Sequence, residues 1–95
     1  MKVFAWDPGK NESLKDERHV SFEEVVAAIA IGGLLDVLEH PNQSKYPNQR
    51  LYVVNLHGYV CLVPFVESKD EVFLKTIIPS RKMTKKYLPG GEENE

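Results

Sequence analysis

The sequence predicts an α+β fold: an N-terminal strand, two helices, an antiparallel sheet meander and a short basic C-terminal helix. Two observations favour this class. Helical periodicity is confined to the first third of the chain, and β-branched or aromatic runs separated by turn formers fill most of the rest. Ninety-five residues suffice for one small domain. We expect it over residues 1–88, followed by a disordered acidic tail over residues 89–95.

The first elements are a strand over residues 3–6 and a polar helix over "PGKNESLKDER". Asp7 and Pro8 indicate where the helix begins, because Asp caps free N–H groups and Pro has the φ angle of a first helical residue. Leu14 is its most apolar interior residue and the expected buried anchor. This helix is therefore expected on the surface.

The second helix begins with "SFEE", which is a capping box: Ser21 accepts from the Glu24 N–H while the Glu24 side chain reaches back. Apolar residues then recur at helical spacing up to Ala30. The pair "GG" at residues 32–33 ends the helix. This helix has one apolar face with which to cover a sheet.

Four apolar runs after the helices predict the strands of the meander. Turn formers separate them: a long loop over "HPNQSKYPNQR", an "HG" hairpin turn and an "ESKDE" turn. Pro64 lacks an N–H group and is expected at an edge or a bulge. The strand runs are, in order, "LLDVLEHPN", "RLYVVNL", "YVCLVPFV" and "VFLKTII".

Composition limits the classes of function. The net charge of −2 gives no global reason to expect nucleic acid or a membrane as partner. Cys61, the only cysteine, lies in an apolar run and is expected to be a core residue. The N-terminus lacks the pattern of a signal peptide and no stretch is long enough to span a bilayer, so we expect a cytoplasmic protein.

Motifs for cofactors and metals are absent from the sequence. Neither GxGxxG nor GxxxxGK occurs, and one Cys with three scattered His does not make a zinc ligand set. We therefore expect no cofactor and no metal. His40 and His57 each precede a turn residue, so either is a candidate acid or base and equally a plain turn residue.

Positive charge gathers near the end of the chain. From Lys69 to Leu88, six cations face two carboxylates, which gives a local charge of +4 in a chain of net −2. Arg offers a planar fork to two phosphate oxygens and Lys offers a movable point charge. If the end is helical, Arg81 and Lys85 share one face, as do Lys82 and Lys86.

Two interpretations of this cationic run stay open. In the first it binds phosphate, with Tyr87 and Tyr52 stacking on an unpaired base as single-stranded RNA requires. In the second it is a solvated helix face that favours the negative end of the helix dipole.

The two ends of the chain resemble the BrnT family of bacterial toxins. "WDPGKNESLKDERHVSFEEVVAAI" is similar to that family's opening, in which W-D-x-x-K-N leads to V-S-F-E-E-A. "IIPSRKMTKKY" is similar to the closing I-I-S-A-R-x-A-x-x-x-E/Y pattern. The resemblance covers residues 3–88. The matching residues are Trp6, Asp7, Lys10, Asn11, Val20, Ser21, Phe22, Glu23 and Glu24 at the opening and Ile77, Ile78, Arg81, Lys82 and Tyr87 at the close.

The resemblance implies a RelE-like ribonuclease fold and the toxin of a type II toxin–antitoxin pair. Such a toxin cuts RNA, free or on the ribosome, without a metal and inhibits translation. A cognate antitoxin neutralises it, DNA is reached only through that antitoxin, and no membrane is involved. A homodimer and a heterotetramer with the antitoxin are both open. The alternative is a catalytically weak or inactive binding module that docks an antitoxin and takes part in operon autoregulation.

Metal-independent cleavage needs cations for the phosphate, an acid and a base. We assign Arg81 and Lys75 to the scissile phosphate and Tyr87 to stacking or proton donation. The base stays open between a lysine, His57 and a carboxylate such as Glu71. The residues expected to bind flanking RNA are Arg50, Lys82, Lys85, Lys86 and Tyr52.

Overall fold

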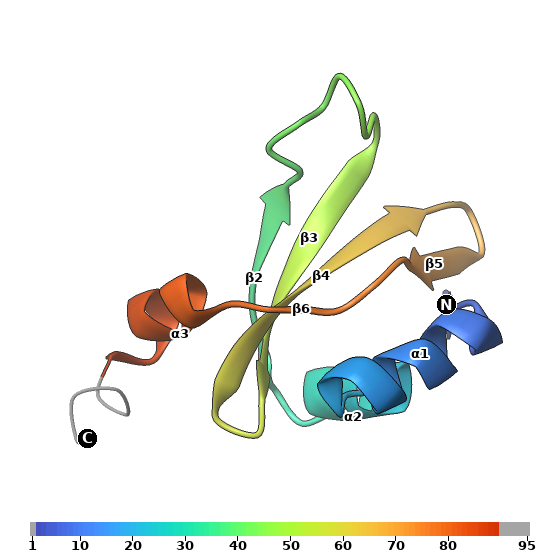
Figure 1. The fold of residues 1–95 in the computed structure, drawn as a ribbon. Coiled ribbons are helices and arrows are strands. Elements are labelled where there is room, and N and C mark those ends of the chain that lie inside the picture. The colour runs from blue at the N-terminus through green and yellow to red at the C-terminus, as the bar shows by residue number, and fades with distance from the viewer. Residues whose placement is uncertain (1, 90–95) are drawn as a thin grey trace.

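A six-stranded sheet with three helices makes up the part of the chain that the computed structural model describes, residues 2–89 (Figure 1). The predicted α+β class is confirmed. The elements are, in chain order, β1 (Val3–Ala5), α1 (Pro8–Arg18), α2 (Phe22–Ala30), β2 (Leu34–Glu39), β3 (Gln49–Leu56), β4 (Tyr59–Glu67), β5 (Glu71–Leu74), β6 (Ile78–Pro79) and α3 (Arg81–Tyr87).

The two N-terminal helices begin where the sequence indicates. The Asp7 side chain accepts from the Gly9 N–H at 3.2 Å. At α2, Ser21 accepts from the Glu24 N–H at 3.2 Å and the Glu24 carboxylate accepts from the Ser21 N–H at 2.9 Å. After α2, position 33 requires glycine, because the Cβ of any other residue would lie 2.7 Å from the Ala28 carbonyl oxygen. The capping box and the glycine stop are both confirmed.

The sheet has the strand order β1-β5-β4-β3-β2, with β6 pairing with β4. The meander from β2 to β5 is antiparallel, as predicted. The N-terminal strand β1 joins it in parallel through β5, with Val3 opposite Glu71. The sheet is therefore mixed, and within residues 2–89 the strands β1, β2 and β6 each pair with one neighbour only.

The last predicted strand, "VFLKTII", is divided in the structure into β5 and β6. Pro64 explains the break. Its carbonyl accepts from the Lys75 N–H at 2.8 Å, so its missing N–H group faces the same stretch, just beyond the end of β5. The ladder to β4 resumes only at Ile78, opposite Leu62. Pro64 thus lies in a central strand, at a gap in the pairing on one side.

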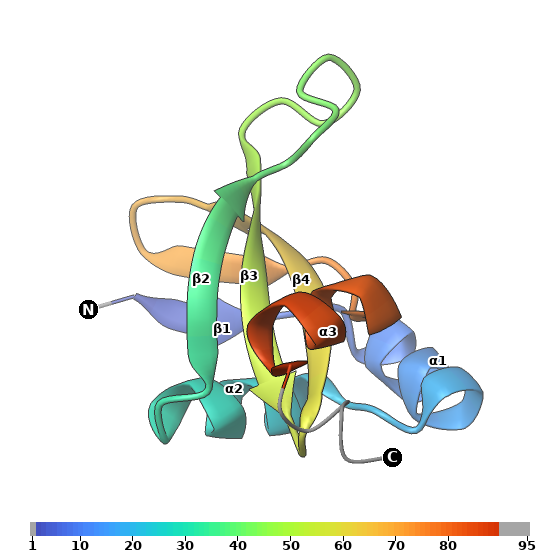
Figure 2. The same ribbon diagram turned by 90° about the vertical axis from the view of Figure 1, so that its left-hand side faces the viewer.

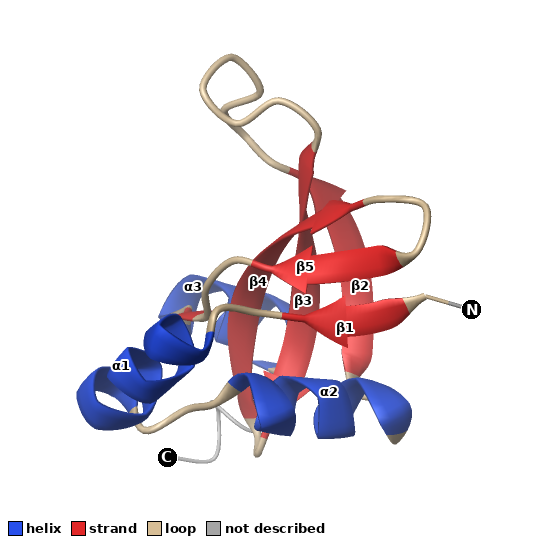
Figure 3. Ribbon diagram, turned by 90° about the vertical axis from the view of Figure 1, so that its right-hand side faces the viewer, coloured by secondary structure: helices blue, strands red, loops and turns tan. Residues whose placement is uncertain are grey.

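The two faces of the sheet carry different helices. Helices α1 and α2 lie on one side and α3 lies on the other (Figures 1 and 2). We call the first the inner face and the second the outer face. β1 and β5 cross in front of β2 and β3, so the sheet curls around the inner face (Figure 3). The buried strand residues of the inner face are Val54, Leu56, Cys61, Val63, Phe65, Val72 and Leu74.

Leu14 is the buried anchor of α1, as predicted. The inner-face core also contains the buried side chains of Phe22 and Phe65, and Trp6 stacks on Phe22 with ring centroids 5.6 Å apart. Cys61 is a free buried thiol, and burial raises its pKa to about 11. No helix within residues 2–89 is long and apolar enough to cross a membrane. The predicted acidic tail, apart from Pro89, lies outside the described residues.

Candidate functional site

Helix α3 carries the cationic run and is fixed to β4 by hydrogen bonds. The Ser80 N–H donates to the Val60 carbonyl at 2.9 Å, and the Val60 N–H donates to Thr84 Oγ1 at 2.9 Å. Ser80 also caps the helix by accepting from the Met83 N–H at 3.1 Å. Thr84 is buried as a result. The helix therefore turns its Thr84 side toward the sheet.

The four cations of α3 are all exposed to solvent. With 3.6 residues per turn, Lys82, Lys85 and Lys86 lie on the half of the helix away from Thr84, and Arg81 lies at the flank, about 60° from Thr84. Within residues 2–89 none of them forms an ion pair. We call this surface the α3 cationic face. Its members are Arg81, Lys82, Lys85 and Lys86.

Tyr87, predicted to stack or to donate a proton, is engaged with the edge strand. Its hydroxyl donates to Asp36 Oδ2 at 2.8 Å. This hydrogen bond lowers the pKa of the Asp36 carboxyl and raises the pKa of the Tyr87 hydroxyl. The contact joins the end of α3 to β2.

Lys75 lies on the same side of the sheet as α3. It follows β5, where Val72 and Leu74 are buried in the inner core and Phe73 alternates to the outer face. Lys75 Nζ lies 5.5 Å from the centre of the Phe73 ring. The structure therefore brings Lys75 and α3 to one face of the sheet.

His57 lies in the turn between β3 and β4 and contacts α2. Its backbone is left-handed, with φ 58°, and its Nε2 lies 3.0 Å from Glu24 Oε2. Its side chain is 76% exposed. The imidazole therefore connects the hairpin to the capping box of α2. Glu71, the carboxylate considered as base, begins β5.

Arg50 and Tyr52 lie on the inner face, opposite to α3. Tyr52 stacks on Phe65 with ring centroids 3.9 Å apart, and burial raises the pKa of its hydroxyl. The Arg50 guanidinium lies 5.1 Å from the centre of the Phe65 ring. Half-buried Tyr52 is thus part of the aromatic packing, and only Arg50 reaches a solvent-filled depression.

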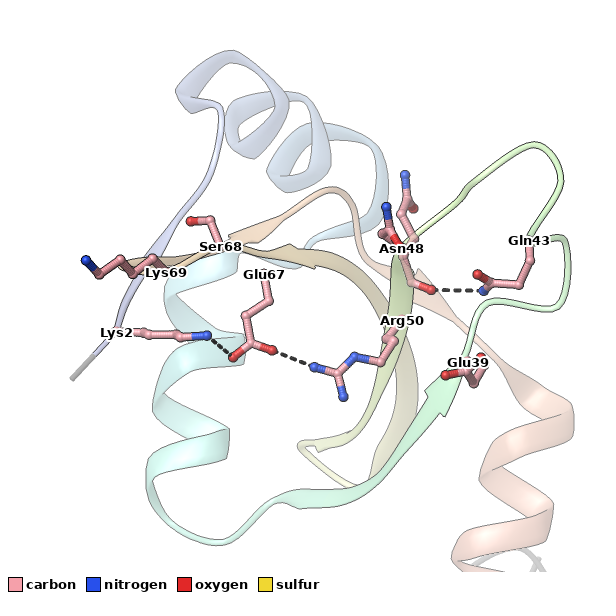
Figure 4. Close-up of a pocket in the computed structure, with 9 residues that line it drawn as sticks. Lys2, Glu39, Gln43, Asn48, Arg50, Glu67, Ser68 and Lys69 are labelled. Carbon is pink, nitrogen blue, oxygen red and sulfur yellow. Dashed lines mark hydrogen bonds and ion pairs between the residues drawn. The ribbon is translucent and has the colours of Figure 1, made fainter.

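That depression, of about 640 Å³, opens where four strands begin or end (Figure 4). We call it the strand-end mouth. The curl of the sheet around the inner face brings these strand ends together. Its lining residues are Lys2, Glu39, Gln43, Asn48, Gln49, Arg50, Glu67, Ser68 and Lys69.

A carboxylate bridges two cations within this mouth. Glu67 Oε2 lies 2.6 Å from Lys2 Nζ, and Glu67 Oε1 lies 2.5 Å from Arg50 Nη2 (Figure 4). The hydrogen bond and charge of Lys2, with the charge of Arg50, lower the pKa of the Glu67 carboxyl. We call these residues the Lys2–Glu67–Arg50 trio.

Sequence reasoning missed Lys2 and Glu67. Arg50 pairs with Phe65, so the two residues share a face of the sheet. Glu67 is two residues after Phe65 on the same strand and therefore lies on that face as well. The residues around Lys2 do not predict its contact with Glu67, because that contact depends on the parallel pairing of β1 with β5. Within residues 2–89, no three His, Cys, Asp or Glu side chains are grouped to hold a metal ion.

The nine predicted site residues therefore fall into three places: the outer face, the β3–β4 turn and the inner face. Comparison of the chain with protein-family models, with curated proteins and with solved structures finds no match.

Proposed function

We propose that this chain is the toxin of a type II toxin–antitoxin pair, a metal-independent endoribonuclease that cuts RNA, inhibits translation and is neutralised by a cognate antitoxin. The observation that carries the proposal is the α3 cationic face: four cations on a helix fixed to the sheet, with no ion-pair partner within residues 2–89.

Such a surface suits a ribose-phosphate strand. Cations without protein partners release condensed counterions when they bind phosphates, which drives sequence-tolerant binding. The chain as a whole is acidic, so the attraction is local and directs RNA to α3. Lys75 extends positive charge along the same face of the sheet.

The order of elements also supports the proposal. The BrnT resemblance implies a strand, two helices, a sheet meander and a basic end, and the observed chain follows that order. The matching opening residues have structural roles here: Asp7 caps α1, Ser21 caps α2 and Asn11 is buried between the helices. The finer assignment, a RelE-like ribonuclease, is part of our proposal.

Expression of the chain alone in bacteria tests this function. We expect growth arrest with loss of cellular RNA, relieved by Arg81→Ala and more fully by neutralising all four cations of the α3 cationic face. The matched control is Lys10→Gln with Lys45→Gln, which removes positive charge from other parts of the surface. Intact RNA and normal growth with the wild-type chain would refute the proposal.

A second candidate is a binding module that docks an antitoxin without cutting RNA. The edge strand β2 favours it, since within residues 2–89 it pairs only with β3 and leaves Leu35 and Val37 36% and 39% exposed. A partner could add a strand to such an edge. A short reading frame downstream would supply the partner. Binding of its product with no nuclease activity would favour this module.

A further inference from the structure

The cationic face of α3 can hold RNA but supplies no base. Cleavage without a metal requires a group that takes the proton from the ribose 2′-hydroxyl while cations stabilise the phosphorus centre. Within residues 2–89 the carboxylate that contacts α3 is Asp36, which the Tyr87 hydroxyl already engages. A carboxylate in contact with cations elsewhere in the described chain is therefore of interest as the base.

The Lys2–Glu67–Arg50 trio supplies both kinds of group at once. Glu67 holds one cation on each carboxylate oxygen, and its side chain remains 32% exposed at the floor of an open depression. Arg50 is held in place by Phe65 beneath its guanidinium. Ligand sites are concave and hold a few polar or charged groups that converge, as this depression does.

We infer that Glu67 is the general base of RNA cleavage and that Arg50 and Lys2 bind the phosphodiester that is cut. The inference rests on the proposed function and names its reaction centre. Lys69 lies at the rim of the same mouth.

The chemistry balances as a transesterification. Glu67 takes the proton of the 2′-hydroxyl, and that oxygen forms a bond to phosphorus. The bond from phosphorus to the 5′-oxygen breaks, and this oxygen takes a proton from water. The hydroxide then recovers the proton from Glu67. The products are a 2′,3′-cyclic phosphate and a 5′-hydroxyl end.

Lys2 and Arg50 also change the proton affinity of the Glu67 carboxylate. In the free protein they lower the pKa of the Glu67 carboxyl, so the carboxylate is ionised and able to accept a proton at neutral pH. A bound phosphate competes for Arg50 and Lys2, which raises the proton affinity of Glu67 when it must act. The other charged or titratable groups that face it are Glu39 from β2, Tyr52 from β3 and Lys69 from the β4–β5 turn.

The test is cleavage of a single-stranded RNA oligonucleotide by the purified chain across a range of pH. We expect Glu67→Gln to lower kcat by about 100- to 10,000-fold with little change in KM, and to abolish the acid limb of the profile. The control is Glu12→Gln, which removes another carboxylate paired with a lysine, 3.1 Å from Lys15 on α1. It should cleave like the wild type.

A second variant keeps the inference testable if Glu67→Gln fails to fold. Lys2→Met removes the larger cause of the lowered Glu67 pKa in the free protein, so the acid limb of the kcat/KM profile should move to higher pH. An unmoved limb, or wild-type kcat in Glu67→Gln, overturns the inference while RNA cleavage by the wild type still stands. A wild-type chain that leaves RNA intact overturns the proposed function and this inference together.

Discussion

At the scale of single residues, Asn11 connects the two N-terminal helices. Its side chain is only 3% exposed, accepts from the Phe22 N–H at 2.8 Å and donates to Glu23 Oε1 at 2.8 Å. The first N–H groups of a helix have no partner within the helix, so Asn11 satisfies one of them at the start of α2. Asn11, one of the residues that resemble the BrnT opening, thus stabilises the start of α2.

We predict that Asn11→Ala lowers the free energy of unfolding by about 1–3 kcal/mol, because the buried Phe22 N–H loses its acceptor. Denaturant titration of both proteins measures the change. Ser13→Ala, an exposed change on the same helix, should stay within about 0.5 kcal/mol of the wild type. Equal stability of the two variants would contradict this role for Asn11.

The contact between Tyr87 and Asp36 predicts a pH dependence. The Tyr87 hydroxyl lowers the pKa of the Asp36 carboxyl below its usual 3.8, so the contact stabilises the fold above that pH. The stabilisation is lost as the pH falls through the lowered value. Tyr87→Phe should therefore raise the midpoint of the Asp36 titration, as followed by NMR. An unchanged midpoint would show that this hydrogen bond is not formed in solution.

At the scale of elements, one buried hydroxyl contributes to the attachment of α3 to β4. Thr84 Oγ1 accepts from the N–H of Val60, which is fully buried, and donates to the Ser80 carbonyl at 2.7 Å. The same helix presents the cations outward. An uncharged contact therefore helps to set the orientation of the α3 cationic face.

We predict that Thr84→Val destabilises the protein by about 1–3 kcal/mol, because the shape is kept while the Val60 N–H loses its acceptor. Amide hydrogen exchange at Val60 should be faster in this variant than in the wild type. Thr84→Ser keeps the hydroxyl and serves as the control, with slow exchange retained. Fast exchange at Val60 in the wild type would argue against the docked position of α3.

Elements marked by local chemistry were predictable from the sequence, and those set by pairing were not. Asp7 and Ser21 predict where α1 and α2 begin, because a helix cap involves only residues that are close in the sequence. The break between β5 and β6 depends on Pro64, which lies on a different strand. Likewise, alternation within a strand predicts that Arg50 and Tyr52 share a face, but only the position of α3 shows that they lie opposite the cations.

At the scale of the whole molecule, charge is unevenly distributed. The chain is acidic overall, yet α3 holds four cations in seven residues. Charge, ring type and local motifs in the sequence predict which residues could bind RNA, but they do not predict which of these residues lie together. The folded chain separates them by face, because residues distant in sequence are assembled by strand order. The strand-end mouth, built from β1 to β4, required the complete topology and was missed.

We predict that neutralising Arg81, Lys82, Lys85 and Lys86 together weakens RNA binding and its dependence on salt. Each phosphate contact on a single strand contributes about 0.7 to the slope of log K against log salt. The slope should fall in magnitude by up to about 3 in an anisotropy titration with single-stranded RNA. An equal slope in the wild type and the variant would place the RNA elsewhere.

The parallel contact of β1 with β5 has a consequence for synthesis. Within residues 2–89, residues 3–5 pair only with residues 71–73, so β1 has no strand partner until three quarters of the chain has been translated. The contact of Lys2 with Glu67 likewise requires residues far apart in the sequence. Under the proposed function, the proposed reaction centre would therefore be completed only late in synthesis.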